Sequence, residues 1–162
     1  MPGMRSLPSR RDLLPLIVVD AATKGDDWLE GRTKLTKLVF LAQRETEPAV
    51  IELIRPDEPF QFVPYNYGPF SSQLLADLEE MERRGLVEIS HRPLDSTGTA
   101  SEFLYRPTEE GRRVAQSAEP VEAAHRVRDL VAGYARLSRN RLVRYIYERY
   151  PDAAPSSRPQ TS

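Results

Sequence analysis

The most regular hydrophobic pattern in the chain lies at residues 32–45. Leu35, Leu38, Val39 and Ala42 recur there at the i, i+3, i+4, i+7 spacing of one helix face, and basic residues fall largely on the other faces. This spacing predicts an amphipathic helix. Capping residues, prolines and glycines predict further helices at residues 12–23, from the turn at 68–69 to about residue 84, from residue 108, at 121–137 and at 139–150.

Two short runs of strand-forming residues lie between these helices. Residues 86–90 and 102–106 predict the arms of a β-hairpin, and the polar residues 92–101 predict its turn. Upstream, residues 60–67 alternate aromatic and polar side chains, which favours a short extended segment before the Gly68-Pro69 turn. Because two strands alone cannot bury a face, we expect the hairpin to lie against the helices.

The order of these elements predicts the fold class. Helix, helix, extended segment, helix, strand, turn, strand and helix is the layout of a winged helix with an insertion before its third helix. We therefore expect an α+β, mostly helical fold, with a winged-helix-like core, a two-stranded β-hairpin wing and additional C-terminal helices. The expected division is a flexible leader at 1–11, a winged-helix-like domain at 12–115, a C-terminal helical extension at 116–150 and a disordered tail at 151–162.

Charge is distributed unevenly along the chain, although its formal net value is only −1. Residues 1–44 contain eight Lys and Arg against five Asp and Glu, and residues 106–149 contain ten arginines against six acids. Residues 45–82 contain nine acids and one arginine. The acidic middle segment, which lies between basic flanks, disfavours binding of a polyanion such as DNA to any surface that this segment forms.

The residue inventory argues against chemistry at a catalytic or metal centre. Cysteine is absent, which excludes disulfides, thiol nucleophiles and cysteine-based zinc sites. His91 and His125 stand alone, without the spacing of a metal-binding motif, and no glycine-rich phosphate loop is present. We expect no enzymatic activity, no cofactor and no bound metal.

Hydropathy and the N-terminal residues bear on location. The longest apolar run, Leu13–Val19, contains a proline and is far shorter than the roughly 18 residues of a membrane span. Residues 1–11 lack the apolar region of a secretory signal. Together with the absence of cysteine, this predicts a cytoplasmic protein that does not contact a membrane.

Two motifs resemble known families. Residues 32–43, RTKLTKLVFLAQ, resemble the opening of the Panacea family, the SocA-like antitoxins, and residues 65–70, YNYGPF, resemble that family's YGP turn. Gly85-Leu86-Val87 with residues 105–112 resembles the ending of many winged-helix regulators, although Pro107 replaces the usual leucine. The similarity covers residues 31–115, about half of the chain. It implies a fold and two roles, a DNA-binding regulator or an antitoxin that contacts a protein, and it supplies no catalytic residues.

The leading interpretation is a winged-helix DNA-binding regulator that acts as a homodimer through its C-terminal helices. The start of the helix after Gly68-Pro69 offers unpaired N–H groups and polar side chains to a phosphate or to base edges, whereas the carboxylates further along that helix have to tilt away from DNA. A simpler interpretation of the same serine and lysine positions is a helix cap and a solvated helix face. The residues expected to contact DNA are Lys34, Lys37, Ser71, Ser72, Gln73 and Arg92.

The alternative is an antitoxin-like or adaptor module that binds a protein partner, such as a toxin, through its acidic region. Acidic side chains complement a basic partner, and exposed aromatic residues supply contact area. DNA binding requires a contiguous positive face that includes Lys34, Lys37 and Arg92, whereas a partner-binding module needs an exposed acidic or apolar patch. The residues expected to contact a partner are Tyr65, Tyr67, Phe70, Glu79 and Glu80.

Overall fold

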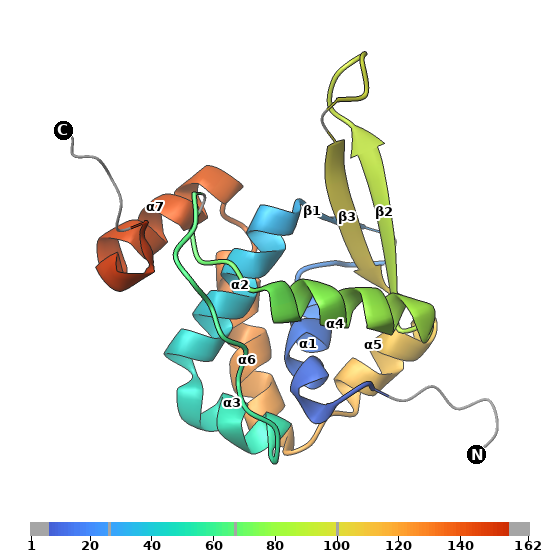
Figure 1. Ribbon diagram of the computed structural model, residues 1–162. Helices are drawn as coiled ribbons and strands as arrows, with labels where there is room; N and C mark the ends of the chain where they lie inside the picture. Colours follow the sequence, from blue (N-terminus) through green and yellow to red (C-terminus); the bar gives the residue numbers. More distant parts are fainter. Residues whose placement is uncertain (1–6, 26, 67, 100, 156–162) are drawn as a thin grey trace.

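The computed structural model describes residues 7–25, 27–66, 68–99 and 101–155. Over these residues the chain forms seven α-helices and one three-stranded antiparallel sheet, which confirms the α+β, mostly helical class (Figure 1). Residues 1–6 of the predicted leader and 156–162 of the predicted tail lie outside the described residues. The helices are α1 (Leu13–Ala21), α2 (Arg32–Glu45), α3 (Glu47–Ile54), α4 (Ser72–Arg83), α5 (Glu109–Gln116), α6 (Val121–Tyr134) and α7 (Arg139–Arg149).

The wing contains one more strand than the sequence predicted. β2 (Val87–Pro93) and β3 (Ser101–Pro107) form the expected hairpin, with His91 opposite Phe103. The short strand β1 (Leu29–Glu30) pairs with the other edge of β3, so the sheet order is β1-β3-β2. Two residues between helices give too little alternation to be read as a strand, and only the pairing with β3 reveals it. Figure 1 shows the hairpin projecting beyond the helices.

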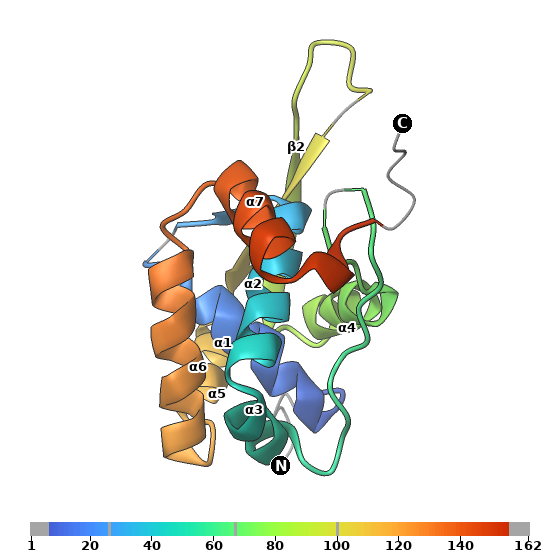
Figure 2. The ribbon, with the colours of Figure 1, turned by 90° about the vertical axis from the view of Figure 1, so that its left-hand side faces the viewer.

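Helix α1 forms the centre of the core. Residues 13–19 are all buried, and α2, α3, α5 and α6 pack around them (Figures 1 and 2). A helix that is covered on every side needs no polar face, which explains why the apolar residues of this segment show mixed spacings rather than one stripe. From α2 and α4, Leu38 and Leu78 extend the same core and are 0% and 1% exposed.

Helix α3 has no counterpart among the predicted elements. It follows α2 after a single residue, Thr46, with Pro48 in its first turn. Val50, Leu53 and Ile54 are fully buried, at a spacing that fits a helix face. The acidic residues of the segment and its length of eight residues obscured this pattern.

Both ends of the described chain are more firmly held than the sequence indicated. Arg10 begins a 3-10 turn, η1 (Arg10–Asp12), and its guanidinium donates to the carbonyls of Leu53 and Glu119 at 2.7 and 2.8 Å. At the other end, Pro151–Ala153 form a second 3-10 turn, η2, in which Ala153 is buried. Residues 10–11 and 151–153, assigned by the sequence to a leader and a tail, therefore pack onto the fold.

The C-terminal helices contribute apolar residues to the core and are also held by polar contacts. Asp20 of α1 is buried and forms salt bridges with Arg112 of α5 and Arg128 of α6 at 2.7 and 2.8 Å. Helix α7 lies across α2 (Figure 2). There the Glu45 carboxylate accepts hydrogen bonds from three tyrosine hydroxyls, those of Tyr134, Tyr145 and Tyr150, at 2.7, 3.1 and 2.5 Å.

These contacts also determine the state of the tyrosines. Burial and the neighbouring Glu45 carboxylate raise the pKa of the Tyr150 hydroxyl to about 12, and they raise that of Tyr134 further. Both hydroxyls therefore stay protonated as donors at neutral pH.

None of the helices in the described parts of the chain has the length and apolar character that a membrane crossing requires.

Candidate interaction surface

The start of α4 uses most of its polar groups within the chain. Ser71 is the N-cap, and its Oγ accepts the N–H of Leu74 at 3.2 Å while the residue is 1% exposed. The side-chain oxygen of Gln73 accepts the N–H of Gln61 at 2.9 Å. Ser72 is exposed. Of the three polar residues predicted to contact DNA here, Ser71 is thus enclosed, Gln73 is tied to the preceding loop and Ser72 faces solvent.

Lys37 lies inside the protein, in contrast to its predicted position on a DNA-binding face. Its residue exposure is 3%, and its Nζ donates to the carbonyl of Pro69 at 2.8 Å. Burial lowers the pKa of the Lys37 amine to about 7. Gly68 has φ +104°, a conformation that favours glycine, and a Cβ there would lie 2.4 Å from Cε of Lys37 and displace the end of that side chain. The two motifs of the family resemblance therefore meet in one contact.

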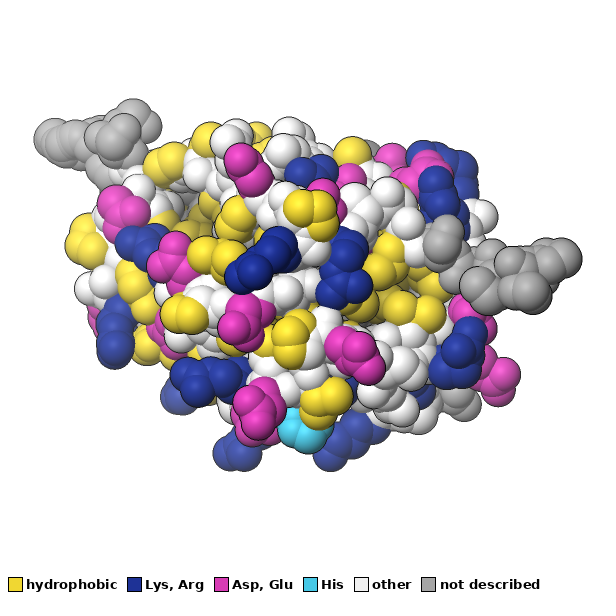
Figure 3. Space-filling view, turned by 90° about the horizontal axis from the view of Figure 1, so that it is seen from below, with side chains coloured by type: hydrophobic (Ala, Val, Ile, Leu, Met, Phe, Trp, Pro, Cys, Tyr) yellow, Lys and Arg dark blue, Asp and Glu magenta, His cyan; other side chains and the backbone are white. Residues whose placement is uncertain are grey.

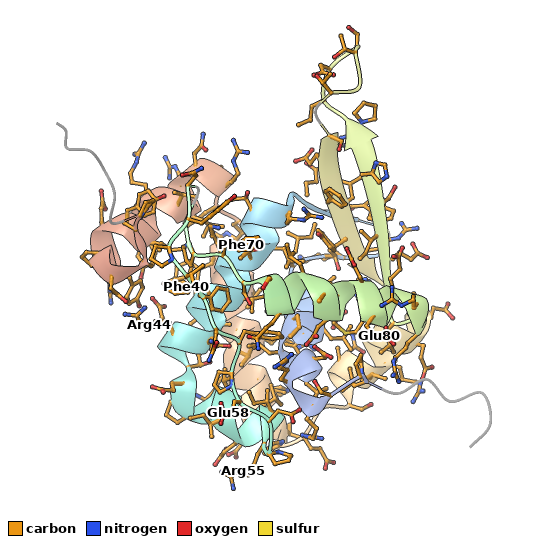
Figure 4. All side chains as sticks on the ribbon, viewed as in Figure 1. Phe40, Arg44, Arg55, Glu58, Phe70 and Glu80 are labelled. Atoms are coloured by element: carbon orange, nitrogen blue, oxygen red, sulfur yellow. The ribbon has the colours of Figure 1, made fainter. Side chains whose placement is uncertain are left out.

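An aromatic pair borders the start of α4. The rings of Tyr65 and Phe70 lie with centroids 5.1 Å apart, and Tyr65 is 53% exposed. Val63 and Phe70 exchange two backbone hydrogen bonds of 2.9 Å, which fixes the loop that carries the pair. Figure 4 shows Phe70 beside the first turn of α4. Tyr67, the third aromatic residue predicted to contact a partner, lies outside the described residues.

The exposed side of α4 is acidic. Glu80 accepts from the guanidinium groups of Arg83 and Arg84 at 2.6 and 3.0 Å, and these contacts lower the pKa of its carboxyl. Its charge is therefore compensated within the helix, which weakens the prediction that Glu80 contacts a partner. Glu79 and Glu82 are exposed, and neither makes a salt bridge within the described ranges. They supply the uncompensated charge of this face.

A groove of about 340 Å³ separates α4 from the wing. Its floor is apolar, and its charged side chains stand at the rim. Burial raises the pKa of the Tyr105 hydroxyl at the floor, and the neighbouring Arg32 guanidinium lowers it in part. The floor is formed by Leu75, Leu78, Ile89, Phe103 and Tyr105, and the rim by Arg32, Glu79, Glu82, Arg83 and His91.

The wing presents little free positive charge. Arg92, predicted to contact DNA, lies 2.6 Å from Glu102 and 3.4 Å from Glu30, and these carboxylates raise the pKa of its guanidinium. Residues 94–99 at the tip contain no lysine or arginine. Instead, Asp95 accepts the hydroxyls of Thr97 and Thr99 there. The tip therefore lacks a cation that would approach a phosphate.

Lys34 alone among the predicted cations remains available at the surface. It lies one turn before Lys37 on α2 and lines a second, larger hollow of about 710 Å³ between the start of α2, the wing and the start of α7. Partial burial lowers the pKa of its amine, and nearby Glu30 opposes this effect. Lys34, Lys37 and Arg92 therefore do not form one positive face.

The acidic middle of the sequence is divided between separate surfaces. Four of its nine acids bind groups of the chain itself: Glu45, Asp57, Asp77 and Glu80. Figure 4 places Glu58, beyond α3, and Glu80, on α4, at distant parts of the molecule. In Figure 3, which shows the end of the molecule that contains α3, acidic and basic side chains intermingle. The remaining acids are Glu47, Glu52 and Glu58 near α3, and Glu79 and Glu82 on α4.

Several residues of the two hollows were not predicted as site residues. Leu75 and Glu82 continue the face of α4 that carries Glu79, so helical spacing alone would have added them. Arg32 and Arg139 begin α2 and α7, respectively, but only the tertiary structure brings the starts of these helices together.

The described residues contain no group of three or more His, Asp or Glu side chains arranged to hold a metal ion. No family model matches the chain, and neither a curated protein nor a solved structure is significantly similar to it. The resemblance to SocA-like antitoxins therefore rests on the two sequence motifs alone.

Proposed function

We propose that this protein is a protein-interaction module of the antitoxin or adaptor type. The groove between α4 and the wing would bind a basic, amphipathic segment of a protein partner. One observation carries the proposal: Glu79 and Glu82, without cationic partners in the described chain, stand at the rim of an apolar floor. Apolar side chains of the partner would cover Leu75 and Ile89, and its lysines or arginines would approach the two carboxylates.

The same features weigh against α4 as a helix that enters a DNA groove. In a winged helix this helix faces the duplex, and DNA selects for positive charge on that face. Here the exposed side of α4 carries Glu79 and Glu82, and its capping serine is enclosed. The order of elements still favours a DNA-binding regulator as the second candidate, so the experiment includes a DNA arm.

The homodimer is not part of the proposal. The C-terminal helices were expected to form the dimer surface. Tyr134, Tyr145 and Tyr150 instead donate to Glu45 of the same chain.

The test combines crosslinking with charge reversal. A photocrosslinking amino acid replaces Ala76, an exposed residue of α4, in the full chain expressed in its native host, and the crosslinked protein is identified. Glu79→Lys with Glu82→Lys should lower the crosslinked yield at least about tenfold, because like charges then face a basic partner. Glu47→Lys with Glu52→Lys reverses the same number of charges on α3 and should leave the yield unchanged.

Equal yields from both double variants would contradict the proposal. In the DNA arm, duplex affinity is measured at about 50 mM salt, where non-specific binding is strong. If α4 faces DNA, Glu79→Gln with Glu82→Gln should raise the affinity by removing repulsion. An unchanged affinity is expected if α4 binds a protein.

A further inference from the structure

The hollow at the start of α2 lies on the other side of the Arg32–Phe103 contact from the groove. Both depressions share these two residues, and no other residue lines both. In Figure 1 the three elements around the hollow, α7, the start of α2 and the wing, lie in the upper half of the molecule. Most of the lining residues have polar side chains, which include cations, carboxylates, hydroxyls and an amide: Glu30, Gly31, Arg32, Thr33, Lys34, Leu94, Ser101, Glu102, Phe103, Ser138, Arg139 and Asn140.

Positive charge exceeds negative charge in the hollow. Lys34 and Arg139 make no salt bridge or hydrogen bond with side chains of the described residues, and Arg32 makes no salt bridge there. The two glutamates of the lining, Glu30 and Glu102, both pair with Arg92, which offsets one of their two negative charges. The three cations of the lining therefore still leave the hollow with an excess of positive charge. The other eight salt bridges of the described residues involve none of these three cations, so Arg32, Lys34 and Arg139 form a group without carboxylate partners in one hollow.

Arg32 is held in place with a donor unused. Its guanidinium lies 3.9 Å from the centroid of the Phe103 ring, a cation–π contact that restricts its position. Its Nε is buried and has no hydrogen-bond partner among the residues that the structure describes. Buried donors are normally satisfied, so a fixed guanidinium with an unused donor is unusual.

Backbone N–H groups at two helix starts add partial positive charge to the same hollow. Helix α2 begins after Gly31, which offers no side-chain cap to the N–H groups of the first turn. Helix α7 begins in the same hollow after Ser138, whose Oγ accepts the N–H of Arg141 at 3.2 Å. Two helix N-termini thus direct partial positive charge towards one space, in addition to the three cationic side chains.

We propose that this hollow binds phosphate. A tetrahedral dianion accepts several hydrogen bonds at once, and the guanidinium of Arg139, the amine of Lys34 and the hydroxyl of Thr33 surround the space as donors. The phosphate belongs either to a phosphorylated small molecule or to the backbone of a nucleic acid. The proposal is independent of a protein partner at α4, because Lys34 and Arg139 do not line the groove.

The experiment measures binding of pyrophosphate to the full chain by calorimetry at low ionic strength, and binding of a short duplex by fluorescence anisotropy. Lys34→Gln and Arg139→Gln should each weaken pyrophosphate binding about tenfold, the effect of losing one charge-assisted hydrogen bond. Arg144→Gln removes an exposed arginine of the same helix that does not line the hollow, and it should bind like the wild type. Circular dichroism and thermal melting show whether each variant is folded.

The two probes distinguish the source of the phosphate. Binding of pyrophosphate without the duplex indicates a small molecule. Duplex binding that pyrophosphate competes away, with a log–log salt slope about one unit shallower in each hollow variant, indicates a nucleic-acid backbone. Failure of both probes to bind, or equal binding by Lys34→Gln, Arg139→Gln and Arg144→Gln, would overturn the proposal.

Discussion

The starts of α4 and α2 carry similar groups but use them differently. At α4, the serine cap is enclosed, Gln73 bridges to Gln61, and Lys37 from beneath donates to Pro69. At α2, the cap is a glycine, and Lys34 lines a hollow and makes no hydrogen bond or salt bridge with side chains of the described residues. The contrast shows that a cationic or polar residue near a helix start indicates a binding site only when the chain itself leaves its hydrogen-bonding capacity unused.

The two lysines of α2 give the largest expected difference. Lys37→Ala removes a buried stem and leaves the Pro69 carbonyl without its donor, so it should lower the free energy of unfolding by about 2–4 kcal/mol. Lys34→Ala acts on a partly exposed residue and should change it by less than about 0.5 kcal/mol. Urea unfolding of both variants measures the difference. Equal losses of unfolding free energy in the two variants would mean that Lys34 and Lys37 are equally exposed.

Lys37 should also give stability a pH dependence that Lys34 does not. Its pKa is about 7 in the folded chain and 10.5 as the ordinary value, so between these limits the unfolded chain binds more protons. Its contribution to stability is therefore fully present above 10.5 and is lost as the pH falls to about 7. Relative to Lys37→Met, which has no titrating group there, the wild type should gain up to about 1 kcal/mol per pH unit across this window.

Asp12 opposes this trend in the wild type. Burial and neighbouring Asp77 raise the pKa of the Asp12 carboxyl to about 8, so its contribution to stability falls as the pH rises towards that value. The wild type and Lys37→Met both contain Asp12, so its effect cancels when their free energies of unfolding are subtracted. Unfolding curves at several pH values from about 7 to 10 provide the measurement, and parallel pH profiles of the two proteins would show that Lys37 keeps an ordinary pKa.

The two serines at the start of α4 should show the same contrast between an enclosed and an exposed residue, with a smaller effect on stability. Ser71→Ala removes the cap and should cost about 1 kcal/mol, which is a fall of about 2–4 °C in melting temperature for a chain of this size. Ser72→Ala alters an exposed residue and should be close to neutral, within about 0.5 kcal/mol. Thermal melts of both variants provide the check. A larger effect from Ser72→Ala would mean that the cap lies one residue later.

Arg92→Gln should have the smallest effect on stability and still change binding. Its ion pairs with Glu30 and Glu102 are exposed, so we expect the melting temperature to stay within about a degree of the wild type. The variant frees two carboxylates at the hollow, and pyrophosphate should then bind severalfold more weakly. Calorimetry measures this loss. An unchanged affinity for pyrophosphate would show that Arg92 does not reduce the repulsion between these glutamates and the ligand.

The sequence by itself determined the local features of the fold. The spacing of apolar residues predicted α2 with its observed bounds, Arg32–Glu45. Residues three and four positions apart lie on the same face of a helix, so this pattern can be read from neighbouring residues alone. Short-range signals also indicated caps at Thr108, at Ser138 and at either Ser71 or Ser72. In the structure Thr108, Ser138 and Ser71 each accept a backbone N–H three residues later. The hairpin followed from two runs of strand-forming residues, since its arms pair across a local turn.

Only the tertiary structure decided which of these features reach the surface together. Lys34 and Lys37 are neighbours on one helix face, and no local pattern separates them. The loop at residues 60–70 covers the second turn of α2 and leaves the first turn open, so one lysine is buried and the other lines a hollow. The pairing of β1 with β3 and the meeting of the starts of α2 and α7 likewise join residues far apart in the chain. Such contacts depend on the packing of whole elements, and no pattern within a single element encodes them.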